Sequence, residues 1–382
     1  MNLEERIGLD KVTLSNFRIT EINFQKLLKH SNIELDRDGK YNYLLQNGNS
    51  FRWLKVLDTN KFGCLIAGTK INQDMKQDYS RIEIRICDIK YGNLQNKTLK
   101  EFKQSVNEIF AYIADEYGII TDISNIKISR MEINCTMFLQ NKFYQYHRLF
   151  KLWMFNLPNS NKKLGQFSAI NQKNKSLDNE TFFRSNTLME IKIYDKTKHL
   201  NDTKNLKITD NILRIELSLL KAQKIREIFG SNQLSKLTDE KINYYFFNQF
   251  LYLFENPYKK WKKHNLSNLQ ELIIKYKNKY ANQWFRNMQN ELCNQEQEKQ
   301  IPALLDINDL FIALKTLKIE HFQRTKNSIM RQLDDTNSVY LNNDSEKANE
   351  IINKVHNIYK NFEIPLPFST VSHGHKSTCV HL

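Results

Sequence analysis

The sequence has little of what marks linkers, disulfide frameworks or membrane spans. Its 382 residues include only 10 Gly and 5 Pro, so few linkers are evident. The cysteines are odd in number and far apart, without a C-x-x-C pair, which argues against a disulfide framework or a zinc ribbon. These cysteines are Cys64, Cys87, Cys135, Cys293 and Cys379. No run of about eighteen apolar residues occurs, and charges near Met1 replace the apolar stretch of a secretory signal. We therefore expect a soluble, cytoplasmic protein in a reducing compartment.

Positive charge, in contrast, is in excess. The chain has 57 Lys and Arg against 42 Asp and Glu, a formal net charge of +15 and a pI of about 9.3. Such a balance favours partners that carry phosphates, nucleic acids above all, although membrane surfaces attract the same charge. A Lys- and Asn-rich composition can also reflect an AT-rich genome, so the charge narrows the class of partner without fixing it.

The hydrophobic periodicity changes along the chain. Up to about residue 220, stretches rich in β-branched and aromatic residues alternate with polar ones and predict strands at 11–20, 51–58, 63–70, 80–89, 127–138, 187–196 and 212–220. Helical spacing occurs at 101–117, which ends at Gly118, and at 142–155. Farther along, 237–255 and 269–290 also read as helices, and the aromatic residues between 244 and 254 read as core. We expect an α+β fold with a central antiparallel sheet flanked by helices, followed by a helical C-terminal domain. The predicted boundaries are 1–230, 231–364 and a flexible tail at 365–382.

Four of these predicted strands carry a charge on every second residue. Arg130, Glu132 and Asn134 would share one face, opposite Met131, Ile133 and Cys135. The same alternation sets apart Glu190, Lys192 and Tyr194, then Arg214, Glu216 and Ser218, and also Arg81, Glu83 and Arg85. An antiparallel sheet often leaves one face in water, and for any single strand that explanation is sufficient. If the strands are neighbours, however, one face gathers carboxylates, cations and a phenol.

Such a face suits cleavage of a phosphodiester by a tyrosine. A phenol with a pKa near 10 needs a cation, metal or base to become a nucleophile, and Lys192 and Lys196 flank Tyr194. Carboxylates hold the hard divalent ions that stabilise charge on a phosphoryl group. Because these strands contain no histidine, the metal would be Mg²⁺ or Mn²⁺ with oxygen ligands.

Three blocks carry a resemblance to a known class of protein. Residues 129–132 (SRME), 188–196 (LMEIKIYDK) and 213–217 (LRIEL) resemble the core motifs of rolling-circle replication initiators, both the gene II/X proteins of filamentous phages and the Rep proteins of staphylococcal plasmids. An earlier block, from Ile82 to Asn93, is similar to the phage proteins. The resemblance covers roughly residues 80 to 230 and depends on the order and spacing of short blocks. Glu132 stands where these families more often have Asp, which leaves its role as a direct metal ligand open.

The resemblance implies a variant of the rolling-circle nickase fold and a role for each residue in the motifs. Tyr194 would become linked to a DNA 5′ phosphate, assisted by Lys192 and Lys196. Glu132 and Glu216 would be metal-site or base residues, and Glu83 would be a further metal ligand. The remaining motif residues would bind DNA, namely Arg130, Arg214, Arg81 and Arg85. The implied activity is nicking of one origin strand, which leaves a 3′-OH primer, and later rejoining of the ends.

The partners expected with this activity are single- and double-stranded origin DNA, together with a host helicase and polymerase; a homodimer is one option. A basic segment around an aromatic residue could add a grip on DNA. It consists of Lys259, Lys260, Trp261, Lys262 and Lys263. Two other signals carry less weight. The terminal histidines at 373, 375 and 381 with Cys379 read as a tail rather than a zinc site. His147 and His199 read as surface or capping residues.

Other functions fit part of the same pattern. A relaxase for plasmid mobilisation would use the same chemistry in another process. A non-catalytic, sequence-specific DNA-binding protein would need neither the metal nor the tyrosine. A metal-dependent nuclease with water as nucleophile would keep the carboxylates and tolerate Tyr194→Phe.

Overall fold

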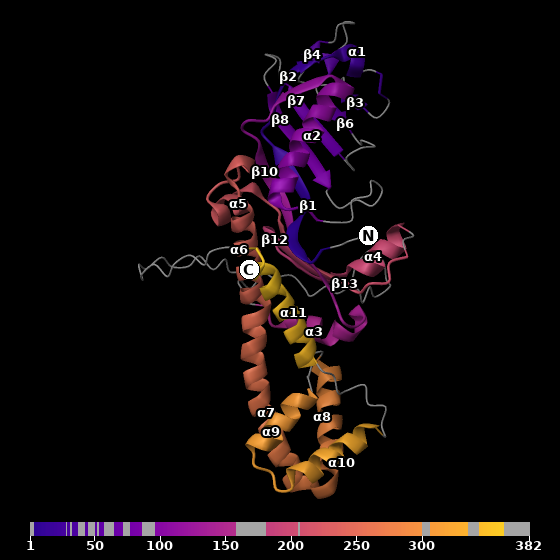
Figure 1. Cartoon of the computed structure of the whole chain (residues 1–382), viewed down its shortest axis with the longest axis vertical. Coiled ribbons are helices and arrows are strands. Elements are labelled where there is room, and N and C mark those ends of the chain that lie inside the picture. The colour runs from indigo at the N-terminus through magenta and orange to yellow at the C-terminus, as the bar shows by residue number, and fades with distance from the viewer. Residues whose placement is uncertain are drawn as a thin grey trace, which may run out of the picture.

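The computed structural model describes residues 4–27, 29–30, 33–36, 43–44, 50–51, 53–56, 65–71, 77–85, 96–157, 181–204, 207–299, 306–334 and 344–362. In this part of the chain the fold is α+β, with an antiparallel sheet at one end and helices at the other (Figure 1). The sequence between 86 and 95, which includes Lys90–Asn93 of the predicted motif, and the tail after residue 362 lie outside the described residues.

The main sheet has nine strands, all antiparallel to their neighbours. Their order is β11 (Thr181–Ser185), β12 (Met189–Asp195), β13 (Ile212–Leu219), β10 (Lys127–Phe138), β1 (Arg6–Ser15), β8 (Gln77–Arg85), β7 (Leu65–Ile71), β6 (Trp53–Val56), β3 (Ile33–Asp36). Two small sheets pair β2 (Arg18–Ile22) with β9 (Ile119–Asp122), and β4 (Tyr43–Leu44) with β5 (Ser50–Phe51). Strands β10, β12 and β13, which carry the predicted motifs, therefore lie side by side.

Helices cover the sheet and then continue beyond it. Around the sheet lie α1 (Phe24–Leu27), α2 (Leu99–Tyr117), η2 (Phe143–Tyr146), α3 (His147–Phe155), α4 (Lys196–Lys204), α5 (Ala222–Phe229), η3 (Leu234–Lys236), α6 (Asp239–Phe250), the π-helical turn η4 (Leu251–Glu255) and α11 (Asp344–Lys360). The far end contains α7 (Asn256–Tyr280), η5 (Ala281–Gln283), α8 (Trp284–Lys299), α9 (Ile307–Thr316) and α10 (Phe322–Asp334). No further strand follows β13 among the described residues.

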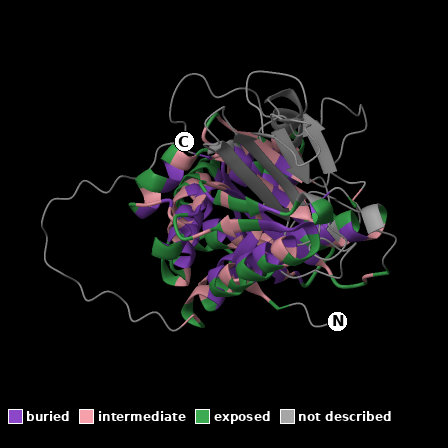
Figure 2. Cartoon of the chain, turned by 90° about the horizontal axis from the view of Figure 1, so that it is seen from above, coloured by how far each residue is buried: buried purple, intermediate pink, exposed green. Residues whose placement is uncertain are grey.

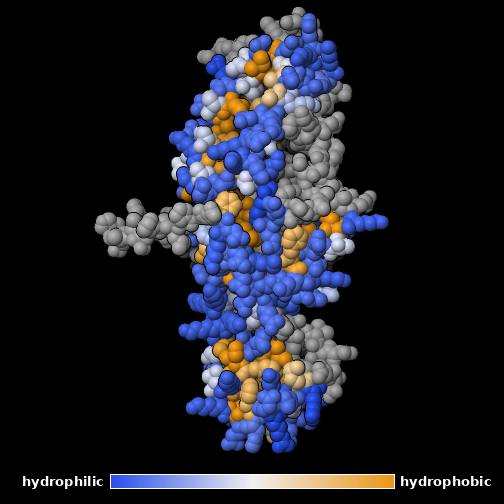
Figure 3. Space-filling model, viewed as in Figure 1, coloured by the Kyte–Doolittle hydropathy of each residue, from blue (hydrophilic) through white to orange (hydrophobic). Residues whose placement is uncertain are grey.

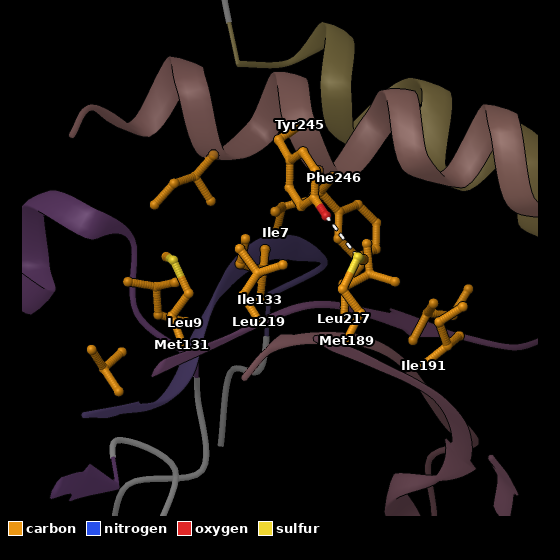
Figure 4. Close-up of a cluster of buried hydrophobic side chains, with 14 of the residues drawn as sticks. Ile7, Leu9, Met131, Ile133, Met189, Ile191, Leu217, Leu219, Tyr245 and Phe246 are labelled. Atoms are coloured by element: carbon orange, nitrogen blue, oxygen red, sulfur yellow. Dashed lines mark hydrogen bonds between the residues drawn. The ribbon is translucent and has the colours of Figure 1, made fainter. Parts of the chain in front are cut away.

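One face of the sheet is aliphatic and packs against helix α6. Figure 4 shows Ile133, Leu217 and Ile191 from neighbouring strands below the rings of Tyr245 and Phe246. These side chains are buried because period-two alternation turns every second residue of each strand to the same face. The Tyr245 hydroxyl donates to Met189 Sδ at 3.9 Å. Seen from above, the buried residues lie mainly in the interior of the described chain and the exposed residues toward its outside (Figure 2).

The helical end has a core of its own. Side chains of α7, α8, α9 and α10, with Leu269, Phe285, Leu314 and Ile329 among them, form a second hydrophobic cluster, whereas α6 and α11 belong to the cluster of the sheet. The boundary expected after residue 230 stays a prediction, but these two clusters place α6 with the sheet. In the view of Figure 3, hydrophobic patches are present on the helical end and on the sheet end as well.

Several predicted elements match the structure. The strand at 127–138 and the helix ending at Gly118 are confirmed; Thr98 caps that helix and Gly118 adopts the left-handed conformation that favours glycine. The strand expected at 11–20 is instead divided into β1 and β2, because Asn16 has a φ of 62° and turns the chain. The helix expected at 269–290 is interrupted for the same reason, since Ala281 has a φ of 43°.

Candidate functional site

The polar face of the sheet is itself buried on strands β10 and β13. Glu132, Asn134, Arg214 and Glu216 are at most 8% exposed. The alternative of a simple water-facing surface is therefore wrong for these two strands. Burying charges is costly unless they are paired, so the partners of each group determine what this face can do.

The first cross-strand row contains Tyr194. Across the strands, Tyr194 of β12 pairs with Arg214 of β13, which pairs with Thr136 of β10. Arg214 donates from Nε to Thr136 Oγ1 at 3.1 Å and from Nη1 to Asp10 Oδ2 at 2.7 Å. With its guanidinium 1% exposed and fixed by two partners, Arg214 presents a positive charge in a set orientation beside the phenol.

The second row supplies a carboxylate for the same phenol. Lys192 pairs with Glu216, and Glu216 pairs with Asn134. The Tyr194 hydroxyl donates to Glu216 Oε2 at 3.4 Å, while Lys192 Nζ donates to Glu216 Oε1 at 2.8 Å. Burial alone would lower the pKa of Lys192, but Glu216 and its neighbouring carboxylates raise it, so this lysine stays charged.

The third row adds two more carboxylates. Glu190 pairs with Ser218, which pairs with Glu132. Arg130 Nη2 lies 3.2 Å from Glu132 Oε1 and 3.7 Å from Glu190 Oε2. Burial first, and then the negative charge of Glu216, raise the pKa of Glu132 to about 7, although Lys192 acts in the opposite direction. Glu132 therefore exchanges a proton near neutral pH.

The phenol of Tyr194 is protonated at rest. Burial raises its pKa well above the usual value, Arg214 opposes the rise, and the charges of Glu216 and Asp10 add to it. Lys196 Nζ lies 6.0 Å from the centre of the ring, and the His199 ring meets it edge-on with centroids 6.0 Å apart. A nucleophilic role for Tyr194 therefore requires a group that takes its proton, and Glu216 is placed to do so.

Asn96 covers part of the polar face, because the chain at Asn96 and Lys97 comes very close to Gly8. The Asn96 Nδ2 donates to Asn134 Oδ1 at 2.7 Å, and the backbone of the next residue, Lys97, is hydrogen-bonded to the backbone of Leu9. A Cβ on Gly8 would lie 2.8 Å from the Lys97 carbonyl oxygen and 2.9 Å from the Asn96 side chain. Only glycine permits this approach.

The predicted DNA-binding and metal residues are spread more widely than the sequence suggested. Arg81, Glu83 and Arg85 are on β8, one strand beyond β1, where Glu83 pairs in the backbone register with Thr13. Their side chains are outside the described part of the structure. Thr13 also pairs with Arg130, so Glu83 is two strands away from the β10 motif.

The basic segment of α7 is partly engaged in structural contacts. Lys259 Nζ contacts Glu255, Trp261 packs against the main core, and Lys262 Nζ lies 3.3 Å from Asp309 Oδ1. Lys259, Lys260 and Lys263 are all exposed, although Lys259 is paired with Glu255.

Two residues that the sequence did not single out belong to the site. Asp10 reaches Arg214 because β1 has an irregularity between Leu9 and Val12, and the expected strand began only after Asp10. Phe183 of β11 pairs with Lys192 and is half-buried, whereas its neighbour Phe182 is in the core. The apolar–polar alternation of 181–185 was the available signal for Phe183.

A cation site formed by protein groups alone is not preassembled. Within the described ranges, no three His, Cys, Asp or Glu side chains come together as a metal site. None of the helices in those ranges is long and apolar enough to cross a membrane.

Comparisons with known protein families and with curated proteins find no match to the sequence. A solved structure, the rolling circle replication initiator protein from Geobacillus stearothermophilus, is similar at 12% sequence identity and a TM-score of 0.29. The alignment covers 58% of this chain and 77% of the other chain. A likeness at this level does not establish a relationship, so the function must be argued from the site.

Proposed function

We propose that this protein cuts one strand of DNA by attack of the Tyr194 hydroxyl and initiates rolling-circle replication. The observation that carries the proposal is the position of the phenol, which donates to the Glu216 carboxylate at 3.4 Å and lies beside the buried Arg214 guanidinium. A base and a fixed cation on either side of a tyrosine are what nucleophilic attack on phosphorus needs.

The protein groups divide the chemical step between them. Glu216 takes the phenolic proton as the Tyr194 oxygen bonds to phosphorus, and the bond from phosphorus to the 3′ oxygen breaks. The 3′ oxygen leaves with a proton; in the absence of a bound metal ion, Glu132 is the best placed carrier, because its pKa of about 7 lets it be protonated at neutral pH. Arg214 and Lys192 offset charge on the phosphoryl oxygens. The products are a 5′-phosphotyrosyl link and a free 3′-OH, and the reverse step rejoins the ends.

A divalent cation fits the charge of this face. The pKa of Glu132 is raised first by burial and then by repulsion from Glu216, and a cation would relieve this repulsion. Mg²⁺ is often held by one or two carboxylates together with phosphate oxygens. Glu132 and Glu216 would be its ligands on the described strands, with Glu83 as a further candidate, and Mn²⁺ could serve equally well. When bound, the ion would neutralise charge on the phosphoryl group.

The process proposed for this chemistry is replication of a phage or plasmid, in which the 3′-OH primes a host polymerase behind a helicase. A relaxase would perform the same cleavage, so the chemistry is the part of the proposal that can be tested with the protein alone.

The experiment is covalent capture. Wild-type protein and Tyr194→Phe are incubated with labelled single-stranded DNA and with supercoiled origin DNA in Mg²⁺ or Mn²⁺, and denatured adducts are resolved by electrophoresis. Tyr144→Phe is the matched control, because Tyr144 is 61% exposed and lies outside the site. We expect adducts with wild type and Tyr144→Phe only. Cleavage that persists in Tyr194→Phe would indicate water as the nucleophile, and binding without any cleavage would indicate a non-catalytic DNA-binding protein.

A further inference from the structure

Helices α9 and α10 form a pair at the end of the molecule away from the sheet. Both contribute to the second hydrophobic cluster, with Leu310 and Leu314 from α9 and Ile329 from α10. The 25-residue helix α7 leads from the sheet to this pair (Figure 1). At 1.5 Å per residue, α7 spans about 38 Å. The pair is therefore a separate surface, remote from Tyr194.

The turn between the two helices has an unusual backbone. Ile319 N donates to the Leu314 carbonyl, which closes α9 with the six-to-one hydrogen bond of a Schellman motif. Lys318 has a φ of 50° and His321 a φ of 55°, so two residues other than glycine are in the left-handed region within one short turn. Strained backbone of this kind persists only where the surroundings fix it, and here it sets the direction in which α10 leaves α9.

The outward face of α10 is polar and basic. Between Phe322 and Leu333 the helix has three cations and no acid. Five exposed side chains form one polar face at helical spacing, namely Gln323, Arg324, Asn327, Ser328 and Arg331, and Met330, 38% exposed, lies at its edge. The Gln323 amide donates to Asn327 Oδ1 at 3.2 Å, so the two amides are neighbours on this face.

These side chains match the chemistry of base edges in a DNA duplex. Arginine binds the O6 and N7 acceptors of guanine, and Asn or Gln binds the N6 and N7 groups of adenine. In a helix-turn-helix unit the second helix enters the major groove with its N-terminal residues toward the bases, and Gln323, Arg324 and Asn327 are in the first half of α10. The lack of acidic residues between Phe322 and Leu333 also complements the negative charge of a duplex.

We propose that α10 is a recognition helix that reads duplex DNA in the major groove. The inference rests on the proposed function in taking DNA as the partner, and it adds duplex recognition at a surface distinct from the cleaved strand.

The test is selection of bound sequences from a pool of duplexes with a randomised centre, using the full chain. The variants are Arg324→Ala/Arg331→Ala and Asn327→Ala. The matched control is Lys275→Ala/Arg286→Ala, which removes two exposed charges from α7 and α8 of the same helical end. Thermal unfolding of each variant establishes that it is folded.

We expect wild type and the control to enrich the same sequence motif. The double arginine variant should bind that motif about 10- to 100-fold more weakly, and Asn327→Ala should lose the preference at one base position. Equal enrichment by wild type and the α10 variants would overturn the proposal, as would the absence of any enriched motif.

The same selection with Tyr194→Phe separates this proposal from the proposed function. The variant should enrich the wild-type motif although it forms no covalent adduct. Enrichment without any adduct in wild type would leave α10 as a recognition helix and contradict the nickase. Adducts in wild type without an enriched motif would support the nickase and contradict the recognition helix.

Discussion

The sheet and the helical end place their charged side chains in opposite ways. On the sheet, Arg214 and Glu216 are almost completely buried and are fixed by partners, whereas on α10 the cations Arg324 and Arg331 are exposed. Chemistry on a phosphate benefits from fixed charges shielded from water, because their interactions are then strong and need no reorganisation. Recognition of a duplex needs side chains that can reach the partner. The buried charges of the sheet are therefore suited to chemistry on a phosphate, and the exposed cations of α10 to recognition of a duplex.

A shared capping residue joins the two regions. Asp306 accepts hydrogen bonds from the amides of Asn308 and Asp309 at the start of α9, and from the amide of Ser345 at the start of α11. Lys262 of α7 reaches the same place, because its Nζ donates to Ser345 Oγ at 2.9 Å and lies 3.3 Å from Asp309 Oδ1. The position of the helical end thus depends on buried polar contacts as well as on apolar packing.

The largest effect is expected from Glu216→Gln. This change keeps the shape of the side chain but removes the acceptor of the Tyr194 proton, so adduct formation should slow by about 10²- to 10⁴-fold. The rate is measured with single-stranded DNA under single-turnover conditions. Glu227→Gln, at an exposed position on α5, should react at the wild-type rate. An unchanged rate in Glu216→Gln would show that another group accepts the proton.

Loss of the Lys262 charge should weaken the contact between the helical end and the sheet region without affecting DNA cleavage. In Lys262→Met the carboxylate of Asp309, which is 1% exposed, loses its cation, and the free energy of unfolding should fall by roughly 3 kcal/mol. Urea denaturation measures the change, and Lys263→Met, one residue along and exposed, is the control. Equal stability of the two variants would mean that the Lys262–Asp309 pair does not hold the regions together.

Glu132 should make the stability of the sheet depend on pH. Its pKa is about 7 in the fold against a usual value of 4.5, so the folded state binds this proton more tightly than the unfolded state. The stabilisation from the proton is present at low pH and is lost as the pH rises through 7. The free energy of unfolding of Glu132→Gln, relative to that of wild type, should therefore rise by roughly 1–3 kcal/mol as the pH is raised from about 5 to about 8. A difference between the two proteins that is the same at both pH values would contradict this assignment.

The smallest effect is expected at Phe183, the half-buried aromatic residue that pairs with Lys192. If a base of the cut strand stacks on this ring, Phe183→Ala should bind single-stranded DNA about 5- to 50-fold more weakly, whereas Phe183→Trp should keep the affinity. Duplex selection through α10 should not change in either variant. Wild-type affinity in Phe183→Ala would remove this residue from the DNA path.

Much of the sheet could be predicted from local patterns, because alternation specifies both the strand and the face of each side chain. The polar face of β10, β12 and β13 was read in this way, and the structure places these strands side by side. Asp10 could not be found, since its contact with Arg214 depends on an irregularity in β1 and on pairing between strands far apart in sequence. Nor could burial of Glu132 and Asn134 be predicted, because a charged alternating strand looks the same whether water or protein covers it.

The most direct measurement of the central claim is to identify the residue that carries DNA. Wild-type protein is reacted with single-stranded DNA, the DNA is digested with nuclease, and tryptic peptides are mapped by mass spectrometry. We expect a nucleotide linked through its 5′ phosphate to Tyr194, within the tryptic peptide Ile193–Lys196. A modified residue elsewhere, or DNA cleaved without any modified peptide, would contradict the assignment of Tyr194 as the nucleophile.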